Sequence, residues 1–159
     1  MKNKTKSYLS LIIWIALLLL VGAIIGNITK TSVDTWYKTL NKSPLNPPNY
    51  LFSIVWGILY AMIAISGWII WYTNSFTGLK TIKQLYVVQL VLNWSWTPLF
   101  FSYRLIGASL ICLCAIIIAV TLLIIKTYKK INPAFLLLTP YLLWLLFAAY
   151  LNFYIWQHN

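Results

Sequence analysis

The sequence predicts an all-α membrane protein, a bundle of five transmembrane helices, and three observations support this class. Of the 159 residues, 62% are hydrophobic and only 8% are charged, against roughly 25% charged residues in ordinary soluble domains. An apolar helix needs about 20 residues to cross the hydrocarbon core of a bilayer, and five segments reach that length. Unbroken apolar runs such as 110–125 exclude a β-barrel, whose strands alternate apolar and polar residues.

The five expected transmembrane helices cover residues 8–26, 49–72, 82–101, 105–125 and 133–156. They leave no room for a soluble domain, so we expect 1–159 to form a single domain. Asn46 and Asn132 each precede proline, which is typical of an N-cap residue at the start of a helix. The N-terminus resembles a secretory signal, but its apolar part is longer than the roughly 7–15 residues of such signals. We therefore expect a retained first helix.

The connection between the first two helices, residues 27–48, is the most informative segment. Loops of this length are usually functional or disordered. The stretch from Asp34 to Leu40 has the pattern of one or two helical turns, with Asp34 as N-cap and Trp36 and Tyr37 on the apolar side. We expect this long helical loop between helices 1 and 2 to cover part of the bundle.

The formal net charge of +11 is carried by residues that lie between the helices. Eight of them share the side of the N-terminus and of the second and fourth connections, namely Lys2, Lys4, Lys6, Lys80, Lys83, Lys126, Lys129 and Lys130. The other side carries Lys30, Lys38, Lys42 and Arg104. The positive-inside rule then predicts a cytoplasmic N-terminus and an exterior C-terminus. Because orientation accounts for the charge, we expect no nucleic acid partner. The preference for Lys over Arg indicates an AT-rich coding sequence and a bacterial cell membrane.

The inventory of catalytic groups is short, because Asp34 is the single carboxylate side chain and His158 the single histidine. Paired carboxylates, a Ser/His/Asp triad or a multi-ligand metal site cannot be assembled from these two residues. We therefore expect no catalytic residue of the conventional kind and no metal. Cys112 and Cys114, two positions apart, point to different sides of a helix and are interpreted as small apolar residues.

Three of the expected helices carry a polar and aromatic stripe at helical spacing. The stripes comprise Ser53, Trp56, Tyr60 and Ala64 in the second helix, Gln89, Asn93, Trp96 and Phe100 in the third, and Tyr141, Trp144, Ala148 and Asn152 in the fifth. Two interpretations stay open from spacing alone. The amides either link helices by hydrogen bonds, or they orient a flat apolar ligand that stacks on the rings of a cavity. Pro98 and Pro140 favour a cavity, because each frees a backbone carbonyl.

Four motifs in this order carry a resemblance to a known family. They are Trp36-Tyr37-x-x-Leu40-x-Lys42-x-Pro44-x-x-Pro47-Pro48, Phe52-x-x-x-Trp56-x-x-Leu59-Tyr60, Gln89-x-x-Leu92-Asn93-x-x-Trp96-x-x-Leu99-Phe100-Phe101 and Pro140-Tyr141-Leu142-x-Trp144-x-x-Phe147-Ala148-x-x-Leu151-Asn152. Over essentially the whole chain, these motifs resemble the translocator protein family, also called TspO/MBR, tryptophan-rich sensory proteins or peripheral benzodiazepine receptor-like proteins.

The resemblance implies a five-helix bundle with a pocket beneath the long loop that binds porphyrin or haem as a ligand, with no obligatory cofactor. The positions that match its ligand-binding residues are Trp36, Pro47, Trp56, Tyr60, Asn93, Trp96, Tyr141, Trp144, Ala148 and Asn152. The function it favours is a sensor, scavenger or regulator of porphyrin traffic. Two alternatives stay open, light-dependent porphyrin degradation by Trp photochemistry and small-molecule transport.

Two further expectations concern partners. The family is often dimeric, and the spacing of Gly22 and Gly26 permits close helix approach, either within the protein or between the protomers of a homodimer. The cholesterol-recognition pattern of eukaryotic members needs a basic residue near the C-terminus, and no Lys or Arg follows Lys130. We therefore expect no sterol recognition through that motif. The lipid bilayer and a tetrapyrrole are the expected partners.

Overall fold

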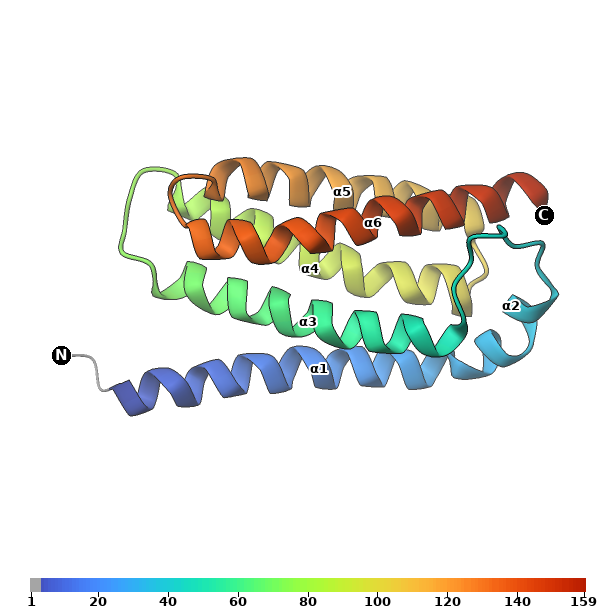
Figure 1. Ribbon diagram of the computed structural model, residues 1–159, viewed down its shortest axis with the longest axis horizontal. Helices are drawn as coiled ribbons and strands as arrows, with labels where there is room; N and C mark the ends of the chain where they lie inside the picture. Colours follow the sequence, from blue (N-terminus) through green and yellow to red (C-terminus); the bar gives the residue numbers. More distant parts are fainter. Residues whose placement is uncertain (1–3) are drawn as a thin grey trace.

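The computed structural model describes residues 4–159, with side chains from residue 8 onward, and all the regular secondary structure in this range is helical (Figure 1). Lys2 and the side chains of Lys4 and Lys6, which were part of the charge count above, lie outside the described residues. The elements are α1 (Lys4–Asp34), α2 (Trp36–Thr39), α3 (Asn49–Tyr72), α4 (Leu79–Thr97), the π-helical turn η1 (Pro98–Ser102), α5 (Ile106–Thr127) and α6 (Asn132–His158). The predicted all-α class is confirmed.

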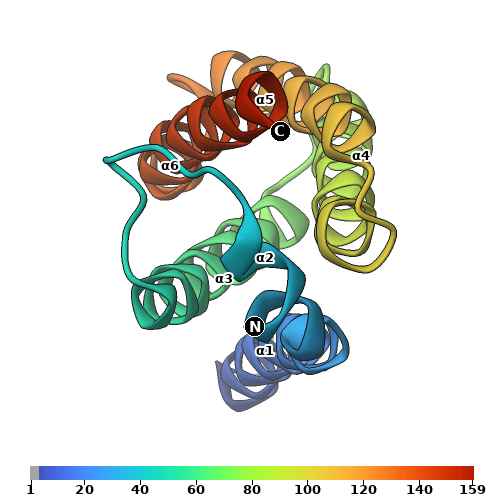
Figure 2. The same ribbon diagram turned by 90° about the vertical axis from the view of Figure 1, so that its right-hand side faces the viewer.

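Four helices of the described chain are long and apolar enough to cross a membrane, so this is an integral membrane protein. They span Tyr8–Asp34, Asn49–Tyr72, Ile106–Thr127 and Asn132–His158. The segment expected as the third transmembrane helix, α4, is more polar than these four, because Lys80, Lys83, Gln89 and Asn93 interrupt its apolar residues. It nevertheless forms one side of the bundle, packed along α5 (Figure 2).

The helices run side by side and place the connections at two ends (Figure 1). The start of α1, the α3–α4 connection and the α5–α6 connection lie at one end, here called the lysine end after Lys80, Lys83, Lys126, Lys129 and Lys130. The loop containing α2, the turn η1 and the C-terminus lie at the other, the loop end. This arrangement agrees with the alternation that underlies the topology prediction, while the orientation in the membrane stays a prediction.

The bundle is formed by contacts of α5 with α4 and α6 and of α3 with α1 and α6. Seen from the loop end, α1 lies below α3, at the outside of the bundle (Figure 2). Most of its apolar side chains, Ile12, Leu20 and Ile28 among them, are exposed on the protein. An apolar face of this kind is suited to contact with lipid.

Two glycines allow close packing against large rings. Tyr86 is fully buried and its hydroxyl donates a 2.9 Å hydrogen bond to the carbonyl of Ile63, while a Cβ on Gly67 would overlap the Tyr86 ring. A Cβ on Gly22 would come within 2.7 Å of the Tyr60 ring. Gly22 therefore serves the contact of α1 with α3 within one chain, and the homodimer stays a prediction.

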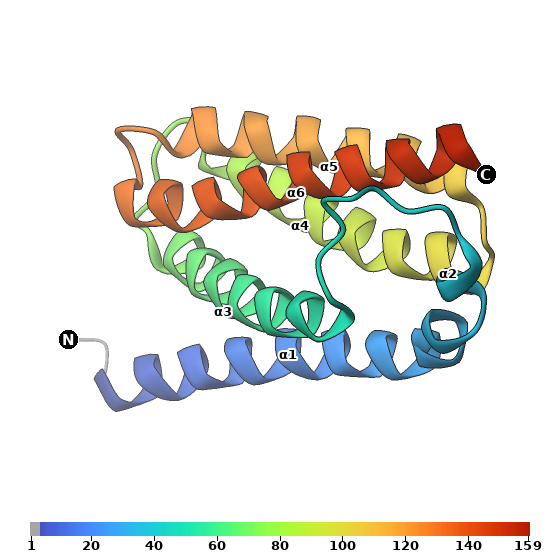
Figure 3. The same ribbon diagram turned by 45° about the vertical axis from the view of Figure 1, so that its right-hand side comes forward.

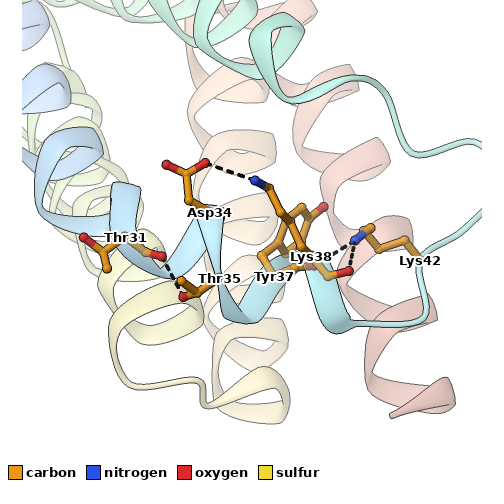
Figure 4. A network of polar contacts seen from close by, with 6 residues as sticks. All are labelled: Thr31, Asp34, Thr35, Tyr37, Lys38 and Lys42. Atoms are coloured by element: carbon orange, nitrogen blue, oxygen red, sulfur yellow. Dashed lines mark hydrogen bonds and ion pairs between the residues drawn. The ribbon is translucent and has the colours of Figure 1, made fainter.

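The first helix is longer than the predicted 8–26, and this changes the role of Asp34. Residues 27–34 contain no glycine or proline and continue α1 to Asp34. The hydroxyl of Thr29 donates to the carbonyl of Ile25 at 3.0 Å, so this buried polar side chain has its hydrogen-bond partner within α1. Asp34 ends α1 instead of capping the next helix, which has Thr35 at its N-cap position. Its carboxylate lies 3.7 Å from Lys38 Nζ at an exposed position (Figure 4).

The predicted helix 49–72 is confirmed as α3, but the two predicted N-caps are wrong. Pro48, and not Asn46, holds the N-cap position of α3, and α6 begins at Asn132 itself, one residue before the predicted start. The segment expected at 82–101 begins earlier, as α4, and changes at Pro98 into η1, where the Tyr103 N–H donates to the Pro98 carbonyl at 3.0 Å. Proline lacks the N–H that would continue the α-helical ladder, and the chain continues here in the wider π turn.

Replacing Gly67 by Ala is expected to lower the melting temperature of the detergent-solubilised protein. The added methyl group overlaps Tyr86 and Trp14, and overpacking of this kind costs about 1–3 kcal/mol. Gly57→Ala is the matched control, since a Cβ there meets nothing within 4 Å among the described residues. Equal melting of both variants would show that the close approach of Tyr86 to α3 is not required.

Candidate functional site

A chain of hydrogen bonds joins three helices in the interior of the bundle. The Tyr60 hydroxyl of α3 donates to Asn93 Oδ1 of α4 at 2.8 Å. Asn93 Nδ2 donates to the Tyr141 hydroxyl of α6 at 2.8 Å, and that hydroxyl donates to Gln89 Oε1 at 3.1 Å. All four side chains are buried. This set is called the amide chain below. In it, both the oxygen and the nitrogen of the Asn93 side-chain amide have a partner within the protein.

Asn152 forms a second junction, one that joins α6 to α5 and α4. Its Nδ2 donates to the carbonyl of Ile106 at 3.0 Å, and its Oδ1 accepts a 2.9 Å hydrogen bond from the Ser109 hydroxyl. The same oxygen lies 3.3 Å from the indole nitrogen of Trp96, which donates to it. Ser109 was absent from the predicted site, because a lone serine in an apolar helix has no spacing signal.

Aromatic rings extend from the amide chain toward the loop end. Trp56 and Trp96 are stacked with centroids 6.4 Å apart, and Trp96 is stacked on Phe100 at 5.7 Å. On the other side, Phe52 meets the Trp144 ring edge-on at 5.9 Å. We call these five residues the aromatic cluster. Stacked and edge-on rings at such distances present flat apolar surfaces from three helices.

Two buried N–H donors, one in the amide chain and one in the aromatic cluster, have no hydrogen-bond acceptor among the described residues. They are Gln89 Nε2 and Trp144 Nε1. Gln89 belongs to the amide chain, and Trp144 lies on α6 about one turn after Tyr141. A buried donor without an acceptor costs about 1–3 kcal/mol, and such groups in a folded protein require an explanation. An acceptor on a bound ligand is one that fits the surrounding rings. The indole nitrogen of Trp94 is in the same condition.

The loop reaches the cluster through two neighbouring rings of α2. Trp36 meets Phe100 edge-on at 5.6 Å, and the Arg104 guanidinium lies 5.7 Å from the Trp36 ring centre. Tyr37 is only 6% exposed, and its hydroxyl donates to Asn46 Oδ1 at 2.8 Å. Burial raises the pKa of the Tyr37 hydroxyl. Lys42 Nζ donates to the Tyr37 carbonyl at 2.7 Å (Figure 4).

Past α2, the loop runs across α6 before α3 begins (Figure 3). Asn41 donates its backbone N–H to Asn159 Oδ1 at 2.9 Å and its Nδ2 to the His158 carbonyl at 3.1 Å. The hydroxyls of Ser43 and Tyr150 are 2.9 Å apart. The loop is thus tied to the last turns of α6. Sequence reasoning missed these contacts, because they join residues more than 100 positions apart.

The structure places the ten predicted site residues as follows. Tyr60, Asn93 and Tyr141 meet in the amide chain, while Trp96 and Asn152 meet in the second junction. Trp56, Trp96 and Trp144 belong to the aromatic cluster, and Trp36 contacts its Phe100. Ala148 is buried on α6, and Pro47 is half-buried in the loop, accepting from Asn46 Nδ2. Ser53, predicted on the same stripe of α3, is exposed.

Three other observations concern the two thiols, metal-ligating groups and the predicted cavity. Cys112 is buried, whereas Cys114 is exposed, so the two thiols point to different sides of α5 as predicted. Among residues 8–159, no three His, Cys, Asp or Glu side chains come together to hold a metal. Trp96 is in contact with Trp56 and Phe100 in the region of the predicted cavity. An open hollow lies at the lysine end, away from this region.

Comparison with known proteins identifies relatives over nearly the whole chain. The sequence profile of the TspO/MBR family matches residues 14–157. The tryptophan-rich protein TspO of Archaeoglobus fulgidus is 40% identical over 151 residues, which are 95% of this chain and 97% of that protein. The protein of the same name from Chlorobaculum tepidum is 35% identical over 161 aligned positions, covering 97% of this chain and 98% of its own. The translocator protein of Bos taurus is 36% identical over 126 residues, 78% of this chain and 75% of its own. The chain therefore belongs to the TspO/MBR family, which has members in archaea, bacteria and mammals.

Proposed function

We propose that this chain is a membrane-embedded binding protein for porphyrin or haem-type tetrapyrroles, acting as a sensor, scavenger or regulator of porphyrin traffic. The observation that carries the proposal is the aromatic cluster beneath the loop, beside two buried N–H donors that lack an acceptor among the described residues. Family membership supports it, since the motifs that resemble the family supply these same residues.

The chemistry of the ligand class fits this arrangement. A tetrapyrrole is a flat, largely apolar ring system with carboxylates at one edge. Rings such as Trp56, Trp96 and Trp144 offer stacking surfaces, and the Trp144 and Gln89 N–H groups offer hydrogen bonds to a ligand oxygen. Arg104 and Lys42, at the loop end, supply cations near the Trp36 and Tyr37 rings. A ligand carboxylate that is not bound by the Trp144 or Gln89 N–H groups would meet these cations at the loop end.

The ligand enters, in this proposal, by displacement of the loop. Trp96 stacks on both Trp56 and Phe100, so a flat ligand that inserts between these rings has to separate one of the stacked pairs. Trp36 lies over Phe100 at the outer edge of the cluster, and Asn41 ties the adjacent loop to the end of α6. Breaking these few contacts at the loop end opens a path without disturbing the amide chain.

The proposal includes α4 as a transmembrane helix, in addition to the four helices named above. Its 19 residues extend for about 28 Å at 1.5 Å per residue, close to the roughly 30 Å thickness of the hydrocarbon core. The amides of Gln89 and Asn93 face the interior and are buried, whereas Val87, Val88 and Val91 are exposed. An apolar outer face and a hydrogen-bonded polar inner face are the pattern of a helix that crosses lipid within a bundle.

Light-dependent porphyrin degradation is the alternative from the enzyme class. The stacked Trp56 and Trp96 pair favours it, because indole rings next to an excited porphyrin can exchange electrons with it. The test is to follow the porphyrin absorption band of the protein–porphyrin mixture under illumination. If the band is lost only when light and oxygen are both present, and is not lost with Trp56→Phe, the protein degrades porphyrin and does not only bind it.

Protoporphyrin IX is expected to quench the intrinsic fluorescence of this nine-tryptophan protein and to saturate at one ligand per chain. Trp144→Phe keeps an aromatic ring at this position and removes the indole N–H that lacks an acceptor among the described residues. Because a hydrogen bond to a charged group contributes about 1.5–3 kcal/mol, the variant should bind roughly tenfold more weakly, with unchanged melting of the free protein.

Trp68→Phe is the control for this measurement, because the Trp68 indole donates to Ser10 at 3.0 Å, outside the aromatic cluster. Its porphyrin affinity should match that of the parent. If Trp144→Phe binds porphyrin as tightly as the parent, the Trp144 N–H group does not bind the ligand.

Trp36→Ala is expected to weaken porphyrin binding by roughly 1–3 kcal/mol, as truncation of an aromatic anchor does, with little change in melting without ligand. Tyr37→Ala provides the comparison, because Tyr37 is buried and bonded to Asn46, and its loss should lower the melting temperature. If Trp36→Ala unfolds the unliganded protein, Trp36 belongs to the core and does not act as a lid.

A further inference from the structure

An open groove lies at the lysine end, separate from the aromatic cluster. Its volume is about 890 Å³, and it is formed by the end of α3, the connection after it and the first turns of α4. The residues that shape it are Trp71, Phe76, Leu79, Lys83, Gln84 and Val87. None of the predicted ligand-binding residues lines it.

The walls of the groove change from basic to apolar along α4. Lys80 and Lys83 occupy the first turns, followed by Gln84 and then by Val87 and Val88. The two valines are 47% and 48% exposed, and they follow Lys83 by slightly more than one turn, or roughly 6–7.5 Å toward the middle of the helix. An exposed apolar strip at that depth has lipid as its natural contact.

Trp71 connects the basic and the apolar parts. It is 37% exposed, and Lys83 Nζ lies 5.5 Å from the centre of its ring. Trp rings of this kind are enriched at the interface between headgroups and hydrocarbon. The position of Trp71 therefore marks the depth at which a headgroup would end and an acyl chain would begin.

The groove lysines have no carboxylate side chain to neutralise them. The 159-residue sequence contains one acidic residue, Asp34, which ends α1 at the loop end and lies 3.7 Å from Lys38. The C-terminus also lies at the loop end (Figure 1). Lys126, Lys129 and Lys130 add further positive charge at the lysine end. An anion is thus the complementary occupant.

We propose that this groove binds one anionic phospholipid of the surrounding bilayer, with its headgroup phosphate against Lys80 and Lys83 and an acyl chain along Trp71, Val87 and Val88. The order of the groove residues matches the order of the groups in such a lipid, anionic first and apolar after it. Basic pockets beside transmembrane helices bind anionic headgroups for the same reason. The site is independent of the porphyrin proposal, since the two share no residue.

Native mass spectrometry of the full chain in non-ionic detergent tests the site directly. With phosphatidylglycerol and phosphatidylcholine of the same acyl chains in equal amounts, the parent should retain one phosphatidylglycerol. Lys80→Gln/Lys83→Gln should bind it roughly tenfold more weakly, because each lysine near the surface attracts anionic lipid. The melting temperature of this variant should match that of the parent, which shows that it is folded.

Lys126→Gln/Lys129→Gln is the matched control, because it removes the same charge from the same end without lining the groove. It should retain the lipid. An equal loss in the control would overturn the groove as the site and leave only attraction by net charge. Equal retention of phosphatidylcholine would overturn the requirement for an anion. Displacement by glycerol phosphate at the same concentration as the lipid would assign the groove to a soluble phosphate ester.

The acyl-chain position has its own readout. Phosphatidylglycerol brominated near the start of its acyl chains should quench the fluorescence of the parent more than that of Trp71→Phe, because bromine quenches only nearby indoles. Equal quenching in the two proteins would place the acyl chain away from Trp71 and contradict the proposed pose.

Discussion

The requirement that polar groups inside a lipid-embedded bundle find partners within the protein governs this structure. Tyr60, Asn93 and Tyr141 meet that requirement by bonding to one another across three helices, and Gln89 meets it at its side-chain oxygen. A shift of α4 along its axis by one turn would leave buried amides without partners, at a cost well above that of ordinary apolar packing changes. The amide chain therefore sets the register of α3, α4 and α6, and Asn152 does the same for α5.

The amide chain and the Asn152 junction lie between two ends of the molecule that differ in chemistry. Toward the loop end, these helix positions hold Trp56 against Trp96 and Phe52 against Trp144. They also leave the N–H groups of Trp144 and Gln89 without an acceptor among the described residues. Toward the lysine end, they place Trp71 of α3 beside Lys83 of α4. The proposed tetrapyrrole site and the proposed lipid groove follow from the same set of helix positions, although neither depends on the other.

The sequence predicted the interior better than the loop. Helical spacing was sufficient to bring Asn93, Tyr60 and Tyr141 together, because amides and phenols in hydrocarbon find one another. The extension of α1 to Asp34 was not predicted, since residues 27–34 are polar and have no apolar period. Asn46 was interpreted as a helix cap, whereas the folded loop brings it to the Tyr37 hydroxyl. The groove was not predicted either, because Trp71 and Lys83 belong to different helices and meet only in the folded protein.

The central claim, that the interior beside the amide chain receives the ligand, is tested most directly by the indole N–H signals in nitrogen-15 NMR of the protein in detergent. Each of the nine tryptophans contributes one such signal. On addition of protoporphyrin IX, the Trp144 signal should move farthest downfield as its donor gains an acceptor, while that of Trp68, already bonded to Ser10, should stay in place. Movement of the Trp68 signal with an unchanged Trp144 signal would contradict the account.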